Sequence, residues 1–277
     1  MAGRLIFIAT PIGNSADLSQ RAMLSLEEAD FIAAEDTRKA VHLFRAIGIR
    51  PNGKLISFYT ANEKSRTSEL VNAVVQGQTV VLMTDAGMPG ISDPGYSLMS
   101  AAISEGLKPI VIPGPSAVTT AVLLSGFEME RFIFDGFIPR SSGARKKYFA
   151  SIKDENRLVV LFESPRRLLS SLEDAAEIFE TEREVAICRE LTKVHEEIFR
   201  GNLTKALNWA KSNEVLGEIT LVIAPSSKSV QYTDEEVKSQ LSNLLASGLD
   251  KKSAISQTVK DSGRTKRDVY AMAHDLA

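Results

Sequence analysis

The chain has 277 residues, with 33 Lys and Arg against 35 Asp and Glu, which gives a formal net charge of −2. This length is comfortable for two domains. The charge balance excludes a protein that binds nucleic acid through bulk positive charge, although a local basic patch remains compatible with it. With 44% hydrophobic and 25% charged residues, the composition also excludes disordered, collagen-like and disulfide-stapled classes.

Cysteine and histidine usage bears on the compartment and on metal binding. Cys188 is the single cysteine, so no intramolecular disulfide can form and a reducing cytosol is the expected location. His42, His195 and His274 are far apart in the sequence, which argues against a structural zinc site. The apolar run 5–9 is too short for a signal-peptide core, and no stretch approaches the roughly 18 apolar residues of a membrane helix. We expect a cytoplasmic protein with no membrane partner and no metal.

The first half of the chain alternates short apolar runs with helical patterns. The expected strands are 4–9, 30–34, 55–58, 79–84 and 108–112. The expected helices are 18–28, 37–47, 64–75, 94–105 and 116–125. Continuous apolar strands that alternate with helices are typical of a parallel sheet covered on both faces. We expect an α/β domain over residues 1–115, with ligands at the carboxyl ends of its strands.

The second half predicts a mixed α/β domain over residues 116–228. The expected strands are 131–137, 158–163, 184–189, 195–200 and 218–224, and the clear helices are 166–178 and 202–212. So few helices for five strands indicate some antiparallel pairs. The segment 139–147 is rich in Ser and basic residues and predicts a flexible basic loop beside a cleft, while 224–229 resembles a linker.

The last segment, 229–277, is helical by pattern. Thr233 is a good helix cap before three acids, and Gly248 and Gly263 punctuate the segment into three short helices. This arrangement resembles a small helix-turn-helix module. Its basic residues are either a solvated helix surface or a nucleic-acid contact face.

The strongest chemical signal is the turn TDAGMPGISDPG at 84–95, directly after an expected buried strand. Its glycines permit unusual backbone angles, while its prolines limit flexibility. Its two carboxylates would repel a phosphate but suit hydroxyls and positive charge, such as a ribose diol or a sulfonium. This points to S-adenosylmethionine more than to ATP or NAD. The turn at 10–14 lacks the G-x-G-x-x-G pattern, and its proline removes an N–H that a phosphate cradle would use.

Four further turns follow expected strands, at 34–38, 112–117, 163–168 and 189–193. Ser116 can cap the helix after it, and the helix's free N–H groups could receive a carboxylate. The acids at 34–38 either favour a helix N-terminus or line the cleft. The charges at 163–168 and 189–193 either form surface ion pairs or belong to the site.

Taken together, these motifs resemble the tetrapyrrole-methylase superfamily of S-adenosylmethionine-dependent enzymes. The matching stretches appear in family order across residues 4–224: ATPIGN, AAEDTR, TDAGMPGISDPG, PGPSAV, FIFDGFIP, ESPRRL, RELTK and GEITLVI. Within the superfamily the likeness is greatest to bacterial enzymes that methylate the ribose 2′-hydroxyl of a cytidine in 16S ribosomal RNA. The resemblance implies two α/β domains with the methyl donor in the cleft between them, a homodimer, and the small ribosomal subunit as partner.

The resemblance also implies positions for the donor. By match to the family's motifs, the donor contacts are Pro11, Asp85, Ala86, Gly87, Met88, Pro89, Ile91, Ser92, Ser116, Ala117, Phe162 and Leu191.

A ribose hydroxyl is barely ionised at neutral pH, so transfer needs either a general base or mainly proximity and orientation. Glu35, Asp36 and Glu190 are the candidate bases, and Arg38 and Lys193 are candidates to hold the ribose-phosphate backbone. This chemistry requires no metal. The expected RNA contacts are the basic residues Arg140, Arg145, Lys146, Lys147, Arg166, Arg167, Lys251, Lys252, Arg264, Lys266 and Arg267.

Two alternatives stay open. A methylase of tetrapyrrole or corrinoid biosynthesis would share fold and donor, but a small macrocycle leaves the basic tail without an obvious role. A ribosome-assembly factor without activity would retain a degenerate donor pocket, and the presence of Asp85, Gly87, Pro89 and Ser116 argues against degeneration.

Overall fold

The computed structural model describes residues 3–226, 233–262 and 264–275. The chain divides into two compact units, 1–150 with 157–224 and 151–156 with 225–277. The larger unit holds two five-stranded sheets, and the smaller holds the C-terminal helices. The domain bounds expected at 115 and 228 stay predictions, and residue 228 lies outside the described residues.

The first sheet is entirely parallel, which confirms the expectation. It is built from β1 (Arg4–Ile8), β2 (Phe31–Ala34), β3 (Lys54–Ser57), β4 (Thr79–Met83) and β5 (Ile110–Ile112) in the order β3-β2-β4-β1-β5. Each strand lies within two residues of its predicted bounds.

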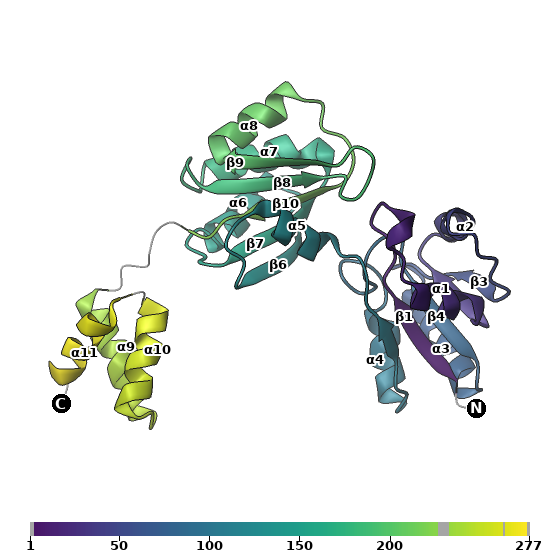
Figure 1. Ribbon diagram of the computed structural model, residues 1–277, viewed down its shortest axis with the longest axis horizontal. Coiled ribbons are helices and arrows are strands. Elements are labelled where there is room, and N and C mark those ends of the chain that lie inside the picture. The colour runs from purple at the N-terminus through teal and green to yellow at the C-terminus, as the bar shows by residue number, and fades with distance from the viewer. Residues whose placement is uncertain (1–2, 227–232, 263, 276–277) are drawn as a thin grey trace. The chain divides into compact units, whose positions relative to one another are not determined.

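Both faces of this sheet are covered, because its strand residues alternate between two apolar cores. Leu5 and Phe7 of β1 pack with α3 (Glu63–Val75) and α4 (Tyr96–Ser104). Ile6 and Ile8 pack with α1 (Gln20–Glu27) and α2 (Thr37–Ala46). Figure 1 shows the helices α1 to α4 around the strands of this sheet. A short 3-10 turn, η1 (Ser15–Asp17), precedes α1.

This arrangement creates a crevice at the carboxyl edge. The neighbouring strands β1 and β4 continue into helices on opposite faces of the sheet, α1 and α4. The two following loops therefore diverge, and such a switch point is where open α/β sheets bind ligands.

The second sheet is mixed, as expected. It contains β6 (Phe132–Phe137), β7 (Leu158–Glu163), β8 (Glu184–Arg189), β9 (Glu197–Asn202) and β10 (Ile219–Ile223) in the order β6-β7-β10-β8-β9. Only β6 and β7 pair in parallel, and α6 (Ser142–Ser151) supplies the crossover that this requires. Helix α5 (Ala117–Ser125) covers one face, and α7 (Pro165–Ala176) packs against α8 (Leu203–Ser212).

Helix α6 corrects the flexible loop expected at 139–147, because helix occupies 142–151. Its pattern is weakly amphipathic, since Phe149 is buried within a largely polar sequence. Phe149 packs on Phe179 with ring centroids 5.4 Å apart, and tertiary packing of this kind overrides a weak local pattern.

The C-terminal unit contains α9 (Asp234–Ala246), α10 (Lys251–Ser262) and α11 (Lys266–Asp275), which confirms three helices. They share a small core that includes Val237, Leu241, Ile255 and Val269. Thr233 and Glu236 form the capping box that begins α9. Gly263 and residues 227–229 of the expected linker lie outside the described residues. Within the described ranges, no helix is long and apolar enough to cross a membrane.

Candidate functional site

The site begins at the carboxyl edge of the first sheet, where Thr10 follows β1 and the 84–95 turn follows β4. Thr10 and Gly87 form an isolated bridge, with N–H···O distances of 2.9 and 3.1 Å in the two directions. The buried Thr10 hydroxyl also donates to the Thr84 carbonyl at 3.1 Å. The φ of Gly87 is +79°, in the left-handed region that favours glycine. The first half of the turn is therefore held against β1.

The second half of this turn is held by α3 and by its own backbone. One carboxylate oxygen of Glu63, Oε1, accepts from the amides of Gly95 and Ser97, each at 3.0 Å. The Gly90 amide donates to the Pro94 carbonyl at 3.2 Å. Ser92 has a φ of +64°, a left-handed conformation that costs a non-glycine residue free energy. The turn is a braced scaffold with a fixed backbone course.

Asp85 connects this turn to the end of β2. Its Oδ1 accepts from the Asp36 amide at 3.0 Å, and its Oδ2 pairs with Lys39 Nζ at 2.8 Å. Its own amide donates to Glu35 Oε2 at 3.2 Å. Asp36 caps α2 and pairs with Arg38 at 2.7 Å. Because β2 and β4 are neighbours, residues about 50 positions apart meet at one edge.

The loop that follows β8 in the second sheet contacts the turn that follows β1 in the first sheet. The Asn14 amide donates to Thr192 Oγ1 at 3.0 Å. Glu190 and Thr192 have φ of 51° and 64°. Glu190 accepts from Lys193 Nζ and from the Glu218 amide, both at 2.8 Å, and Lys193 also pairs with Glu218 at 3.0 Å. Residues 190–193 are thereby locked beside the first sheet.

Two cavities share this region, and Ile12, Ala86 and Glu218 line both. The first, of about 250 Å³, is lined by the expected residues Pro11, Asp36, Asp85, Ala86 and Lys193. The second, of about 340 Å³, is lined by the expected residues Ala86, Gly87, Met88, Ile91, Ser116, Ala117 and Phe162.

The remaining expected residues lie outside the cavity walls: Pro89, Ser92, Leu191, Glu35, Arg38 and Glu190. Leu191 is buried in the apolar cluster that contains Ile12 and Phe162, so it supports the wall from behind. Ser116 begins α5 as expected, but its side chain makes no capping hydrogen bond.

Several lining residues were not named as donor contacts or bases from the sequence, among them Lys39, Asp93, Phe137, Glu163 and Glu218. Asp93 is the second carboxylate of the 84–95 turn, so its charge entered the sequence argument although it was not named as a donor contact. Lys39 and Glu218 carry no local signal, because each enters the site through an ion pair with a residue distant in sequence.

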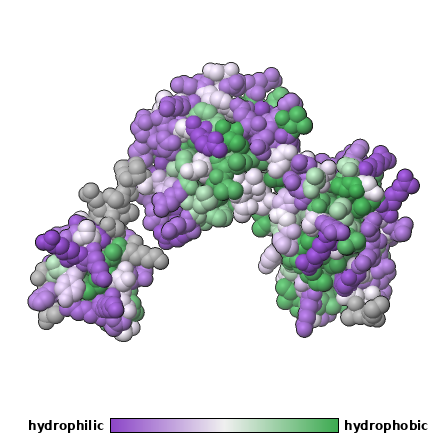
Figure 2. Space-filling view, in the orientation of Figure 1, coloured by the Kyte–Doolittle hydropathy of each residue, from purple (hydrophilic) through white to green (hydrophobic). Residues whose placement is uncertain are grey.

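The second cavity has an aromatic wall. Phe162 packs against Phe134 and Phe137, with ring centroids 4.8 and 5.4 Å apart. Phe137 is 61% exposed although it packs on Phe162. Figure 2 shows hydrophobic surface gathered over β6 and α5. These two elements expose the large apolar side chains of Phe132, Phe137 and Leu123. Such a wall suits a flat apolar group.

The acids of the site differ in their proton affinity. Bonds from Arg38 hold the pKa of Asp36 well below its ordinary range. Burial opposes ionisation of Glu190, yet hydrogen bonds from Lys193 and the Glu218 amide lower its pKa. Burial raises the pKa of Glu35. Burial, together with the charges of Glu35, Asp85 and Glu218, raises the pKa of Asp93 to about 7.

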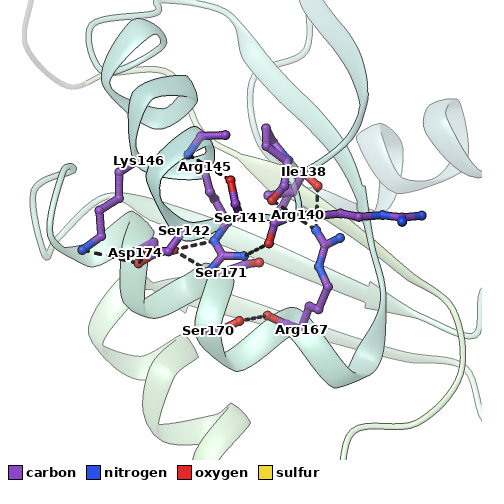
Figure 3. A network of polar contacts seen from close by, with 12 residues as sticks. Ile138, Arg140, Ser141, Ser142, Arg145, Lys146, Arg167, Ser170, Ser171 and Asp174 are labelled. Atoms are coloured by element: carbon purple, nitrogen blue, oxygen red, sulfur yellow. Dashed lines mark hydrogen bonds and ion pairs between the residues drawn. The ribbon is translucent and has the colours of Figure 1, made fainter.

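Around the second sheet, the expected RNA-contact residues form two groups: some are exposed, and others are engaged in contacts within the protein. Arg140, Lys147 and Arg166 are exposed. Arg145 is 4% exposed and pairs with Asp174 at 2.5 Å, as Figure 3 shows. Arg167 donates to the Ile138 carbonyl at 2.6 Å and to Glu163 at 2.8 Å. The expectation that Arg145 faces RNA is corrected here, because its guanidinium is committed to a buried partner.

Lys146 pairs with Glu177 at 2.6 Å. In the C-terminal unit, Lys251, Lys252, Lys266 and Arg267 are exposed, and Arg264 pairs with Asp234 at 2.9 Å. Among the residues that the structure describes, no group of three His, Cys, Asp or Glu is placed to hold a metal ion.

The fold and the cleft define a methylase of a known family. The family model described as Tetrapyrrole (Corrin/Porphyrin) Methylases matches residues 4–207, and the chain belongs to this family. This confirms the fold class and S-adenosylmethionine as the methyl donor of the family.

The relatives are more specific in name. The chain is 40% identical over 277 residues to the Ribosomal RNA small subunit methyltransferase I of Halalkalibacterium halodurans, which covers 98% of this chain and 95% of that protein. It is 46% identical over 222 residues to the protein of the same name from Thermotoga maritima, which covers 80% of this chain and 98% of that protein.

Solved structures share the fold at lower identity. Diphthine synthase superposes with a TM-score of 0.61 at 16% identity, covering 80% of this chain and 90% of that chain. Uroporphyrin-III C-methyl transferase from Thermus thermophilus, complexed with S-adenyl homocysteine, gives 0.56 at 14% identity, covering 80% of this chain and 97% of that chain.

Proposed function

We propose that the chain transfers a methyl group from S-adenosylmethionine to the 2′-hydroxyl of a cytidine ribose in 16S ribosomal RNA. The observation that carries this proposal is the 40% identity to a ribosomal RNA methyltransferase along 98% of the chain, C-terminal helices included. A methylase of small macrocycles gives these helices and their exposed lysines no role. The cytoplasm, where small ribosomal subunits are assembled, and a homodimeric state belong to the same proposal.

The residues present fit the donor. Thr84 Oγ1 is buried in the wall of the first cavity and has no hydrogen-bond partner within the described residues, so it can bond a ligand. The second cavity offers the bare backbone of Gly87 and the aromatic ring of Phe162. The acids Asp85, Asp93 and Glu218 suit a cation and hydroxyls. When bound, the donor supplies an activated methyl group whose departure leaves a neutral thioether.

The chain's own residues then position the RNA. The exposed Arg140, Lys147 and Arg166 and the basic residues of the C-terminal helices would contact phosphates, while the target nucleotide is splayed into the cleft. Arg38 is exposed, and within the part of the chain that the structure describes its side chain bonds to Asp36 alone, so it can exchange this contact for a phosphate. Lys193 borders the first cavity and is proposed to orient the ribose.

Methyl transfer to defined substrates tests the proposal. Purified protein and labelled S-adenosylmethionine are offered to small subunits that lack the modification, to naked 16S RNA and to a tetrapyrrole precursor. The products are digested and separated. We expect label in 2′-O-methylcytidine. Label on the macrocycle alone would instead establish the small-molecule activity, and donor binding without transfer to any substrate would establish the assembly role.

A further inference from the structure

Helix α11 exposes an aromatic side chain, although the C-terminal unit that contains it has its own core. Val269 and Ala273 of this helix are buried in that core, which α9 and α10 share. Tyr270 follows Val269 directly and is 60% exposed. Within the described residues, its hydroxyl forms no hydrogen bond. The ring therefore adds little to the packing of the unit and is accessible to a partner.

Basic residues flank this ring at helical spacing. Lys266 and Arg267 lie four and three residues before Tyr270, and His274 lies four residues after it. Residues three and four apart are neighbours on the surface of a helix, so these four side chains lie on one face. All four are exposed. We call this set of Lys266, Arg267, Tyr270 and His274 the α11 strip.

The positive charge of the α11 strip is not neutralised by the nearby acids that the structure describes. Asp261 accepts from Gln240 at 3.0 Å and from Gln257 at 2.9 Å. Asp268 accepts from the Thr265 hydroxyl at 2.7 Å. Among the described residues, neither the lysine nor the arginine of the strip forms an ion pair. The strip thus combines an exposed aromatic ring with cations that are available to an anionic partner.

We propose that the α11 strip binds an unpaired segment of RNA, with one base stacked on the ring of Tyr270 and the cations on the flanking phosphates. This inference rests on the proposed function and names the kind of RNA that the C-terminal unit contacts. Unpaired bases stack on aromatic side chains, whereas a paired RNA helix is recognised mainly through its shape, its phosphates and its 2′-hydroxyls. A duplex would leave the ring without a role. The same strip on a second copy of the chain would bring like charges together.

The test compares Tyr270→Ala, Tyr270→Phe, Tyr270→Leu and Arg267→Ala in the full chain. Leu249→Ala is the matched control, because it removes another exposed apolar side chain, 39% exposed, from the same unit. Binding to small subunits that lack the modification is measured by filter binding over a range of salt concentrations. Thermal unfolding should be that of wild type in every variant, since the changed side chains are exposed.

Tyr270→Ala should weaken binding by about fivefold or more, which is typical of losing one base–aromatic stack. Its salt dependence should stay that of wild type, because a stacked base releases no counterion. Tyr270→Phe should bind within about twofold of wild type, and Tyr270→Leu should bind as weakly as Tyr270→Ala, since stacking needs the ring. Arg267→Ala should weaken binding and lower the slope of log affinity against log salt by about one. Leu249→Ala should bind as wild type does.

Ultraviolet cross-linking of the wild-type complex, followed by digestion and mass spectrometry, should attach a nucleotide to the peptide that contains Tyr270. Wild-type affinity of Tyr270→Ala or Tyr270→Leu would overturn the proposal. A cross-link from this peptide to a ribosomal protein or to a second copy of the chain would overturn it as well. Methyl transfer by wild type to the same subunits, with no effect of Tyr270→Ala on binding, would refute the α11 strip alone. Absence of transfer to any RNA would refute the proposed function, while the binding data still decide whether the strip holds RNA.

Discussion

Several residues of the site have backbone conformations that are unfavourable for their residue type. Ser92, Glu190 and Thr192 are non-glycine residues at positive φ, and all three belong to segments around the two cavities. Such strain persists only where surrounding contacts over-determine it, and it concentrates at functional positions. Gly13 lies in the turn that contacts Thr192 and Lys193, and there is no room for a side chain larger than hydrogen at this position.

Gly13→Ala should disturb this contact. An added Cβ would lie 2.5 Å from Lys193 Cγ and 2.6 Å from Thr192 Oγ1, so residues 191–193 would have to move. We expect donor affinity to fall at least tenfold by calorimetry. Gly143→Ala is the matched control, since nothing lies within 4 Å of a Cβ there. Equal affinities for the two variants would show that this packing does not shape the donor site.

Asp93 also predicts a stability effect. Its folded-state pKa of about 7 lies above the ordinary 3.8, so the folded protein binds the proton more tightly than the unfolded chain. The ionised carboxylate therefore costs stability, and this cost grows as pH rises from about 4 and levels off above about 7. Allowing for solvent screening, Asp93→Asn should raise the free energy of unfolding at pH 8 by about 1–2 kcal/mol.

Urea unfolding at pH 8 and pH 4 measures this difference. The two proteins should be nearly equal at pH 4, because Asp93 is protonated in the folded state and pH 4 lies close to its ordinary pKa of 3.8, so little of the cost of ionisation has yet developed. A variant that is equally or less stable than wild type at pH 8 would contradict the raised pKa.

At the scale of elements, helix ends and buried pairs position the site. The N-cap residue of helix α4 is Gly95, which has no side chain to accept a hydrogen bond, and Glu63 of α3 supplies the acceptor instead. A carboxylate at this end also interacts favourably with the helix dipole. One side chain thus begins a helix and fixes the end of the 84–95 turn.

Glu63→Ala should destabilise the fold by about 1–2 kcal/mol, the usual cost of losing a cap. Thermal unfolding measures it, with Glu69→Ala on the same helix as control. The Arg66–Glu69 pair is about 40% exposed on both sides, so that change should stay within about 0.5 kcal/mol. A Glu63→Ala variant as stable as the control would show that the 95–97 amides need no acceptor.

The buried pair Arg145–Asp174 anchors α6 to α7. Arg145→Ala leaves Asp174 buried with Ser142 and the more distant Lys146 as its remaining partners among the described residues, and breaking such pairs costs about 3–5 kcal/mol. Thermal unfolding should show this loss, whereas the neighbouring exposed Lys147→Ala should leave stability unchanged and weaken RNA binding. A stable Arg145→Ala variant with weakened RNA binding would restore Arg145 as an RNA contact.

At the scale of the whole molecule, a near-neutral protein must bind RNA through local charge. The formal net charge of −2 leaves no global attraction to phosphate. The exposed lysines and arginines of the C-terminal unit, which has its own small core, are the largest such group.

Deletion of residues 230–277 should leave donor affinity unchanged and weaken binding to small subunits at least tenfold. The salt dependence of the remaining binding should become shallower, because fewer phosphate contacts release counterions. Calorimetry and filter binding over a range of salt concentrations measure the two effects. Equal losses of donor and RNA binding would contradict this division of roles.

The sequence by itself determined the elements and the class of the protein. Strand and helix periodicities are local properties of the sequence, so the strands β1 to β10 were predictable within a few residues. The glycine-rich turn at 84–95 likewise indicated a ligand-binding loop. The tertiary structure alone shows which acids are engaged, that Arg145 is buried and that Asp93 lines a cavity without a hydrogen bond or ion pair to any described residue. The reason is physical: burial, ion pairing and pKa depend on neighbours such as Lys39, Lys193 and Glu218, which the fold brings in from distant parts of the chain.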